Sequence, residues 1–199
     1  MTSPLHPEPP RDRMLRVAGE LFYEHGFQAV GIDLVIERAG VAKATLYRHF
    51  PTKDDLIAEV LTRANQGFWI WLDSVIDEAP TPRDALVAVF DAVASLAASP
   101  NCLGCMFQVT AAEFPNSTHP GHGVALAHKK AVRSRLLRLA KASDLDSPAE
   151  LADALLMLMD GAFAASRMYG PRNHSRNVGR AARRLIEAHS AAVVSASTR

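Results

Sequence analysis

The amino-acid sequence predicts an all-α protein with about nine helices and no β-sheet. Apolar residues recur every three or four positions over most of the chain, as Leu15, Ala18 and Phe22 do near the N-terminus, and this spacing marks one face of a helix. No stretch sustains the apolar–polar alternation of a half-buried strand. Hydrophobic residues make up 48% of the 199 residues, which is enough to bury a sizeable core.

Helix boundaries follow from local start and stop signals. Gly26 is predicted to end the first helix as a left-handed C-cap, and Gly40 supplies the turn after the second. Thr52 and Asp55 fit a capping box at the start of the fourth helix. The predicted helices span 11–25, 32–39, 42–50, 53–78, 82 to just before 100, 104–114, 122–143, 148 to just before 170, and 173–195, with a loop at 115–121.

Two further caps are predicted from proline at the first helical position. Thr81 precedes Pro82 at the fifth helix, and Ser147 precedes Pro148 at the eighth. In both helices an acidic residue stands at the third position, namely Asp84 in the fifth helix and Glu150 in the eighth. We therefore expect both hydroxyls to cap their helices.

Composition excludes several classes of protein. The formal net charge is only +1, so any nucleic-acid contact must come from a local patch. No apolar run approaches the roughly 18 residues typical of a membrane helix, and the proline-rich start carries no secretory signal. Two cysteines do not form a secreted disulfide framework. We therefore expect a cytoplasmic protein that makes no membrane contact.

The segment 26–53 has the outline of a helix-turn-helix. Two short predicted helices flank the Gly40 turn, and the start of a third follows at once. This device lays its second helix in the DNA major groove. That helix alternates inward Leu46 and Phe50 with long donors and hydroxyls, which suit phosphates and base edges.

The arrangement resembles the TetR family of one-component transcriptional regulators. The resemblance rests on G-V-x-K-x-T-L-Y-x-H-F-x-x-K, from Gly40 to Lys53, behind a first amphipathic helix. A weaker likeness covers Gly104 to Pro120. Four prolines among residues 1–10 indicate a flexible arm, and the resemblance implies a DNA-binding domain at 11–54 and a ligand-binding and dimerisation domain at 55–199.

The family's DNA contacts carry over to the matching positions. By resemblance, most of these side chains touch phosphates, while Arg48 is the predicted base contact because guanidinium grips guanine O6 and N7 together. Members often carry Thr or Ser at the positions of Val30 and Gly31, so one or two phosphate contacts are altered here. The predicted DNA-binding residues are Gly31, Lys43, Ala44, Thr45, Tyr47, Arg48, His49 and Lys53.

The C-terminal part offers candidates for a small-molecule site. Met and aromatic residues suit adaptable pockets, although the same spacing is typical of plain core. Asp160 lies in an apolar stretch and could face a ligand cation, an arginine such as Arg167, or a partner subunit. The candidates are Phe68, Trp71, Phe90, Met106, Phe107, Gln108, Thr110, Glu113, His128, Met157, Met159, Asp160 and Phe163.

Cys102 and Cys105 have C-x-x-C spacing, which allows two interpretations. They could be a redox switch or half a metal site with His119 and His122. Alternatively Cys105 belongs to a Gly-Cys pair common in relatives and Cys102 is incidental. The second interpretation is favoured, so no metal or cofactor is expected.

The expected partners are a double-stranded operator, a second copy of the chain and a small-molecule effector. A twofold operator needs two recognition helices, and by resemblance the eighth and ninth helices form the homodimer interface. Basic runs on the seventh and ninth helices are interpreted as solvated faces rather than a second nucleic-acid surface. The interface candidates are Ala154, Leu158, Gly161, Ala165, Val178, Ala182 and Leu185.

The leading functional hypothesis is a homodimeric repressor that a small apolar or amphipathic molecule releases from a palindromic operator. Alternatives are a constitutive or architectural DNA binder without an inducer, and a thiol redox-sensing regulator. A thiol oxidoreductase is the enzyme hypothesis. Because the sequence has no Gly-rich phosphate loop, H-E-x-x-H or nucleophile elbow, we expect no enzymatic activity.

Overall fold

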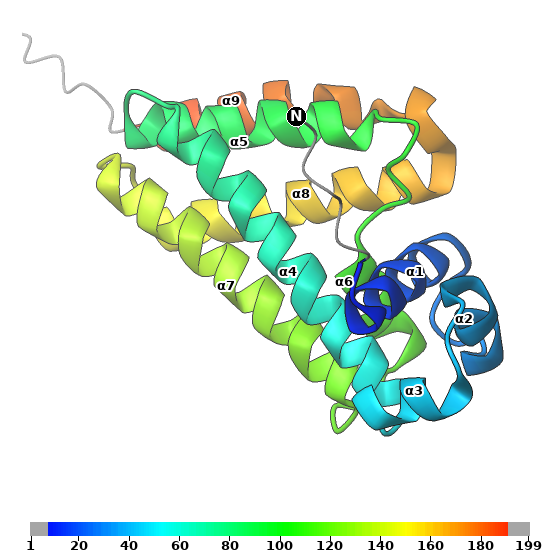
Figure 1. Ribbon diagram of the computed structural model, residues 1–199. Coiled ribbons are helices and arrows are strands. Elements are labelled where there is room, and N and C mark those ends of the chain that lie inside the picture. Colours follow the sequence, from blue (N-terminus) through cyan, green and yellow to red (C-terminus); the bar gives the residue numbers. More distant parts are fainter. Residues whose placement is uncertain (1–7, 191–199) are drawn as a thin grey trace, which may run out of the picture. The chain divides into compact units, whose positions relative to one another are not determined.

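The computed structural model describes residues 8–190, which form α-helices, two 3-10 helices and no strand (Figure 1). The all-α prediction is confirmed. Residues 1–7 of the predicted arm at 1–10 and residues 191–195 of the predicted ninth helix lie outside the described residues. The elements are α1 (Pro10–His25), α2 (Ile32–Ala39), α3 (Lys43–His49), α4 (Lys53–Asp77), α5 (Pro82–Ala97), α6 (Met106–Glu113), α7 (Pro120–Ala142), α8 (Pro148–Tyr169), η1 (Gly170–Arg172), η2 (His174–Asn177) and α9 (Val178–Ala188).

The described chain divides into two compact units. The first unit comprises residues 8–67 and 106–128, and the second comprises 68–105 and 129–190. Helices α4 and α7 each begin in the first unit and end in the second. No helix of the described chain is long and apolar enough to cross a membrane.

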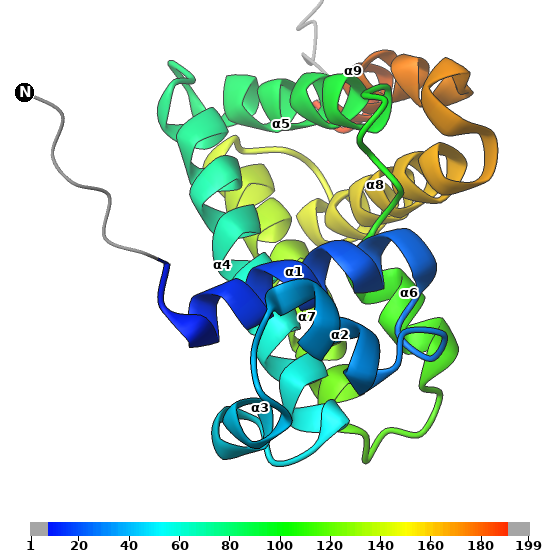
Figure 2. The same ribbon diagram turned by 45° about the vertical axis from the view of Figure 1, so that its right-hand side comes forward.

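In the first unit, α1 packs against α2 and α3, as Figure 2 shows. The side chains of Phe22, Val35 and Leu46 are buried and come from these three helices in turn. Two ion pairs join α1 to α4: Arg11 with Glu59 at 2.7 Å and Arg63 with Asp12 at 3.5 Å. The three-helix arrangement predicted for this segment is therefore present and is fastened to the start of α4.

In the second unit, α5 lies alongside α9, and α8 contacts both (Figures 1 and 2). Its core is a single cluster of apolar side chains that includes Phe90, Leu155 and Ile186. Within each helix, the members of this cluster recur every three or four positions, as expected for a helical core face.

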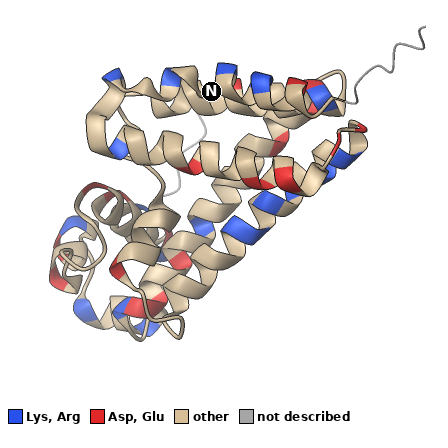
Figure 3. Cartoon of the chain, turned by 180° about the vertical axis from the view of Figure 1, so that it is seen from behind, with Lys and Arg blue, Asp and Glu red and all other residues tan. Residues whose placement is uncertain are grey.

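Three of the six basic residues of α7 form ion pairs within the described part of the second unit. Lys129 pairs with Asp160, Arg133 with Asp153, and Arg135 with Asp73. Figure 3 shows both blue and red segments on the helices of the second unit. The pairing favours a solvated, internally balanced face over a second nucleic-acid surface.

Several predicted caps are confirmed. The Thr52 hydroxyl accepts from Asp55 N–H at 3.1 Å, and an Asp55 carboxylate oxygen accepts from Thr52 N–H at 3.0 Å. Thr81 accepts from Asp84 N–H at the start of α5. Gly40 adopts φ 60° and ψ 46°, the left-handed conformation expected of the turn.

Two predicted caps differ in detail. Gly26 ends α1 with a positive φ of 87°, but its ψ of 163° lies outside the left-handed helical region, because the chain leaves α1 in an extended direction. Ser147 precedes α8 as predicted, yet its side chain makes no capping hydrogen bond. Its backbone is itself left-handed, with φ 45° and ψ 53°, so it does not adopt the extended conformation usual at an N-cap.

The ninth helix was predicted to begin at residue 173, which is wrong. Residues 170–172 form η1, residues 174–177 form η2, and α9 starts at Val178. The cause is tertiary: the Asn173 side chain accepts from Ser175 N–H at 2.7 Å and donates to the Ala97 carbonyl of α5 at 3.0 Å. Asparagine that bonds nearby backbone in this way competes with helix formation.

Candidate nucleic-acid interface

The turn between α2 and α3 is closed by glycine and backbone hydrogen bonds. Gly40 N–H donates to Glu37 O at 3.2 Å, and Val41 N–H donates to Ile36 O at 3.3 Å. Gly40 has φ +60°, which side chains with a Cβ rarely adopt. The chain then enters α3 through Ala42, whose carbonyl accepts from Leu46 N–H at 3.3 Å. The sequence therefore builds the two-helix unit from local chemistry.

Helix α3 exposes nearly all of its predicted DNA-binding side chains. Leu46 is fully buried and Phe50, just beyond the helix, is 2% exposed, so these two anchor α3 on the first unit. Tyr47 is 43% exposed despite its size. The exposed members of the predicted set are Gly31, Lys43, Ala44, Tyr47, Arg48 and His49, and the half-buried members are Thr45 and Lys53.

Lys43 has an acidic neighbour that the sequence did not reveal. Its Nζ lies 3.0 Å from Oδ1 of Asp33 on α2. The hydrogen bond and charge of Asp33 raise the pKa of Lys43, with a smaller contribution from Tyr47. This ion pair joins the N-terminal ends of α2 and α3, and it engages Lys43, which is predicted to contact a DNA phosphate.

Lys53 lies at the first residue of α4 and is held by a backbone acceptor. Its Nζ donates to the Gln28 carbonyl at 3.3 Å. Burial lowers the pKa of Lys53, opposed by the charges of Glu113 and Asp54. The lysine therefore stands at a helix N-terminus, where phosphate is favoured.

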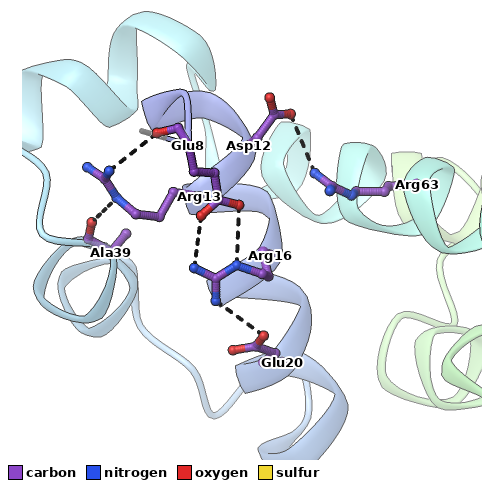
Figure 4. Close-up of polar contacts among 7 residues, drawn as sticks. All are labelled: Glu8, Asp12, Arg13, Arg16, Glu20, Ala39 and Arg63. Atoms are coloured by element: carbon purple, nitrogen blue, oxygen red, sulfur yellow. Dashed lines mark hydrogen bonds and ion pairs between the residues drawn. The ribbon is translucent and has the colours of Figure 1, made fainter. Parts of the chain in front are cut away.

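The first residues of α1 brace the end of α2, as drawn in Figure 4. Arg13 Nε donates to the Ala39 carbonyl at 2.7 Å. Next to it, Arg16 pairs with Glu8 at 3.0 Å and with Glu20 at 3.3 Å. Satisfying a C-terminal carbonyl of α2 with a cation is favourable because that helix end is partially negative.

Glu113 was predicted to orient a ligand, and its carboxylate meets backbone instead. Its two oxygens accept from Phe27 N–H at 3.2 Å and Gln28 N–H at 2.7 Å. No sequence signal pointed to this, because the partners are 85 and 86 residues away. The contact connects the end of α6 to the turn between α1 and α2.

The other ligand candidates of the first unit include buried polar groups. His128 is 4% exposed; its Nδ1 lies 2.8 Å from Asn65 Oδ1, and its ring stacks on Phe107 at 3.7 Å. Thr110 is fully buried and donates to the Met106 carbonyl at 2.9 Å. These polar groups lie among apolar side chains. Ligand pockets typically combine an apolar lining with a few polar groups that orient the ligand.

The candidates of the second unit lie in its packed core or on its surface. Phe90, Met159 and Phe163 are core members, with Phe68 and Trp71 packed against them. In contrast, Met157 is 68% exposed, so it does not belong to the core, and Asp160 pairs with Lys129 of α7, a partner the sequence did not suggest.

The C-x-x-C segment is fastened to α8. Ser166 Oγ donates to the Cys102 carbonyl at 2.7 Å, and Arg167 donates to the Leu103 carbonyl at 3.0 Å. The two cysteines are not joined in a disulfide; Cys102 is buried and Cys105 is half-buried. Within residues 8–190, no group of three or more His, Cys, Asp or Glu side chains gathers as a metal site.

A two-helix unit joined by a left-handed glycine, with a second helix exposing lysine, arginine, tyrosine and histidine, defines a helix-turn-helix DNA-binding protein. The family described as bacterial regulatory proteins, tetR family, matches residues 14–60. A solved TetR-family transcriptional regulator from Streptomyces coelicolor is 31% identical, with a TM-score of 0.87 over 91% of this chain and 96% of that one. The chain belongs to the TetR family and is a DNA-binding transcriptional regulator.

Curated relatives are also named as helix-turn-helix regulators of transcription. The HTH-type transcriptional repressor KstR2 of Mycolicibacterium smegmatis is 30% identical over 92 residues, 44% of this chain and 43% of KstR2. The HTH-type transcriptional activator FasR of the same organism is 36% identical over 85 residues, 41% of this chain and 39% of FasR. The similarity thus includes regulators named for opposite directions of control.

Proposed function

We propose that this protein is a homodimeric repressor that binds a palindromic operator through α3 and is released by a small apolar or amphipathic molecule. The observation that carries the DNA-binding part is the exposed polar face of α3 behind the Gly40 turn. Arg48 reads a base, Lys43, Thr45, Tyr47, His49 and Lys53 contact phosphates, and the small Ala44 lets the helix approach the groove floor. KstR2 is named as a repressor and FasR as an activator, so a reporter experiment decides the direction of control.

The dimer interface we propose lies on the exposed side of α8 with η2 and α9. Residues Met157, Gly161 and Met168 recur at helical spacing along α8 and are exposed. An apolar groove of about 300 Å³ runs between α8, η2 and the start of α9. Leu158, Gly161 and Val178 line this groove, whereas Ala165 and Ala182 are buried within the second unit.

Two copies are needed because one α3 reads only half of a twofold site. Recognition helices of such dimers lie about 34–36 Å apart, or a multiple of that, along the DNA. Isologous contact through one face is the commonest way to build such a pair. The exposed apolar stripe of α8 offers that face.

Effector release follows from linkage. A molecule that binds only the form unable to grip DNA shifts the population away from the operator. The buried His128, with Phe107 and Thr110, supplies polar and aromatic groups for such a molecule in the first unit. Because α4 begins at Lys53 and ends in the second unit, it links the two units covalently.

The experiment is operator binding with and without a panel of small apolar and amphipathic molecules. We expect at least one to weaken binding at least tenfold, matching a typical coupling free energy of about 1–3 kcal/mol. A constitutive binder would show no response to any molecule. Expression of a reporter behind the operator should rise when the protein is deleted, and a fall would identify an activator.

Thiol sensing is the alternative for the signal. Replacing Cys102 and Cys105 with serine should leave DNA binding and effector response unchanged. Loss of the response in that double variant would instead favour a redox-sensing regulator.

A further inference from the structure

The end of α6 grips the turn that follows α1. Both carboxylate oxygens of Glu113 accept backbone N–H groups, from Phe27 at 3.2 Å and from Gln28 at 2.7 Å. The Glu113 carbonyl also accepts from the Gln28 side chain, at 2.5 Å. Three hydrogen bonds therefore join these segments, and charged acceptors make such bonds stronger than neutral ones.

The turn is shaped to receive this carboxylate. Gly26 has φ +87°, and a Cβ at this position would lie 2.6 Å from Glu113 Oε1. Phe27 is fully buried, with its ring 5.2 Å from Phe22 and 6.1 Å from Phe114. The close backbone approach and the aromatic packing hold Glu113 and the turn in one arrangement.

Gln28 links Glu113 to Lys53, a predicted DNA contact. Its N–H and side chain bond Glu113, while its carbonyl accepts from Lys53 Nζ at 3.3 Å. The Glu113 charge also acts directly on Lys53, since it opposes the burial that lowers the pKa of the lysine. Gln28 thus lies between Glu113 and Lys53, and the Glu113 charge favours the protonated lysine.

We propose that Glu113 is a positioning residue for DNA binding, which acts through Gln28 to hold Lys53 where it contacts a phosphate. The proposal rests on the phosphate contact of Lys53 in the proposed function. It assigns to the last residue of α6 a role in DNA affinity, although Glu113 touches no DNA itself.

A double-mutant cycle of Glu113→Gln and Lys53→Ala tests this, with operator affinity measured across a series of salt concentrations. Lys53→Ala should lower the salt slope by about one unit. Glu113→Gln should weaken operator binding by about three- to tenfold in the native background, in the range of couplings between contacting residues. In the Lys53→Ala background, Glu113→Gln should cause no further loss.

Each other outcome overturns the proposal and identifies which part failed. If Lys53→Ala leaves affinity and salt slope unchanged, the phosphate contact is wrong, and so is any role for Glu113 through it. If Lys53→Ala behaves as expected but Glu113→Gln costs the same in both backgrounds, Glu113 has only a structural role. If Glu113→Gln alone leaves operator affinity unchanged, Glu113 does not position Lys53.

Two further variants keep the test decisive. Glu24→Gln makes the same charge change in the first unit at a side chain that is 66% exposed, and should not couple to Lys53→Ala. Gln28→Ala alters an exposed side chain and removes one bond to Glu113, so it should fold even where Glu113→Gln does not. Its smaller loss of affinity should likewise vanish in the Lys53→Ala background, and an additive loss would contradict the proposal.

Discussion

Asp33 holds Lys43 at 3.0 Å across the start of the helix-turn-helix. Both side chains are exposed, by 84% and 63% respectively, so the pair adds little to stability. The consequence of this pair is electrostatic, because Lys43, a predicted phosphate contact, has a negative partner in the absence of DNA. Asp33 should therefore reduce the attraction of this surface for any DNA.

Replacing Asp33 with Asn should strengthen binding to operator and random DNA alike, by about two- to tenfold, and steepen the salt dependence by up to one unit. The measurement is fluorescence anisotropy on both DNAs across salt concentrations. Glu37→Gln, the same charge change four residues further along α2, should have a smaller effect. Equal effects of the two variants would show that Lys43 is not the group Asp33 acts upon.

Arg48→Ala should relax the preference at one base position and cost about 1–3 kcal/mol on the operator. The reason is that a guanidinium can grip guanine with two parallel hydrogen bonds, which no phosphate contact reproduces. Binding to a set of single-base operator variants measures this. An equal loss on every sequence would place Arg48 on a phosphate instead.

Thr52→Ala should destabilise the protein by about 1 kcal/mol, because it removes one half of the capping box at α4. For a chain of this size the melting temperature should fall by about 2–4 °C per kcal/mol. Thr62→Ala is the matched control, since its hydroxyl bonds only the Ala58 carbonyl of its own helix. Equal shifts in calorimetry would mean that the box contributes nothing.

Met157→Lys should weaken the dimer at least tenfold, because it places a charge in the middle of the exposed apolar stripe of α8. Met157 is 68% exposed, so the subunit itself should fold normally. Ile70→Lys alters another large apolar residue of the second unit, 74% exposed, and should leave the dimer intact. Sedimentation velocity measures the oligomeric state of both variants. An unaffected Met157→Lys dimer would place the interface elsewhere.

The sequence predicted best what is decided within a few residues. The Thr52–Asp55 box, the Thr81 cap and the left-handed Gly40 all depend on neighbours in the chain. The all-α class and the bounds of α2 follow equally from local pattern. These features place the helix-turn-helix without any tertiary information.

What the sequence did not predict depends on partners far along the chain. Glu113 contacts Gln28 only in the folded protein. From the sequence, its acidic side chain therefore suggested a ligand contact and not hydrogen bonds to the backbone of a turn. Helix α9 starts later than predicted because the Asn173 side chain donates to the Ala97 carbonyl of α5. Asp33 gave no signal either, since a carboxylate near a helix N-terminus is common.

The most direct test of the account is selection of bound fragments from random and genomic DNA by the full chain, at a stated salt concentration. The account predicts a single enriched palindrome whose half-sites are about one helical turn, or a multiple of it, apart. Binding without an enriched sequence, or enrichment of an unrepeated single site, would contradict a specific dimeric regulator.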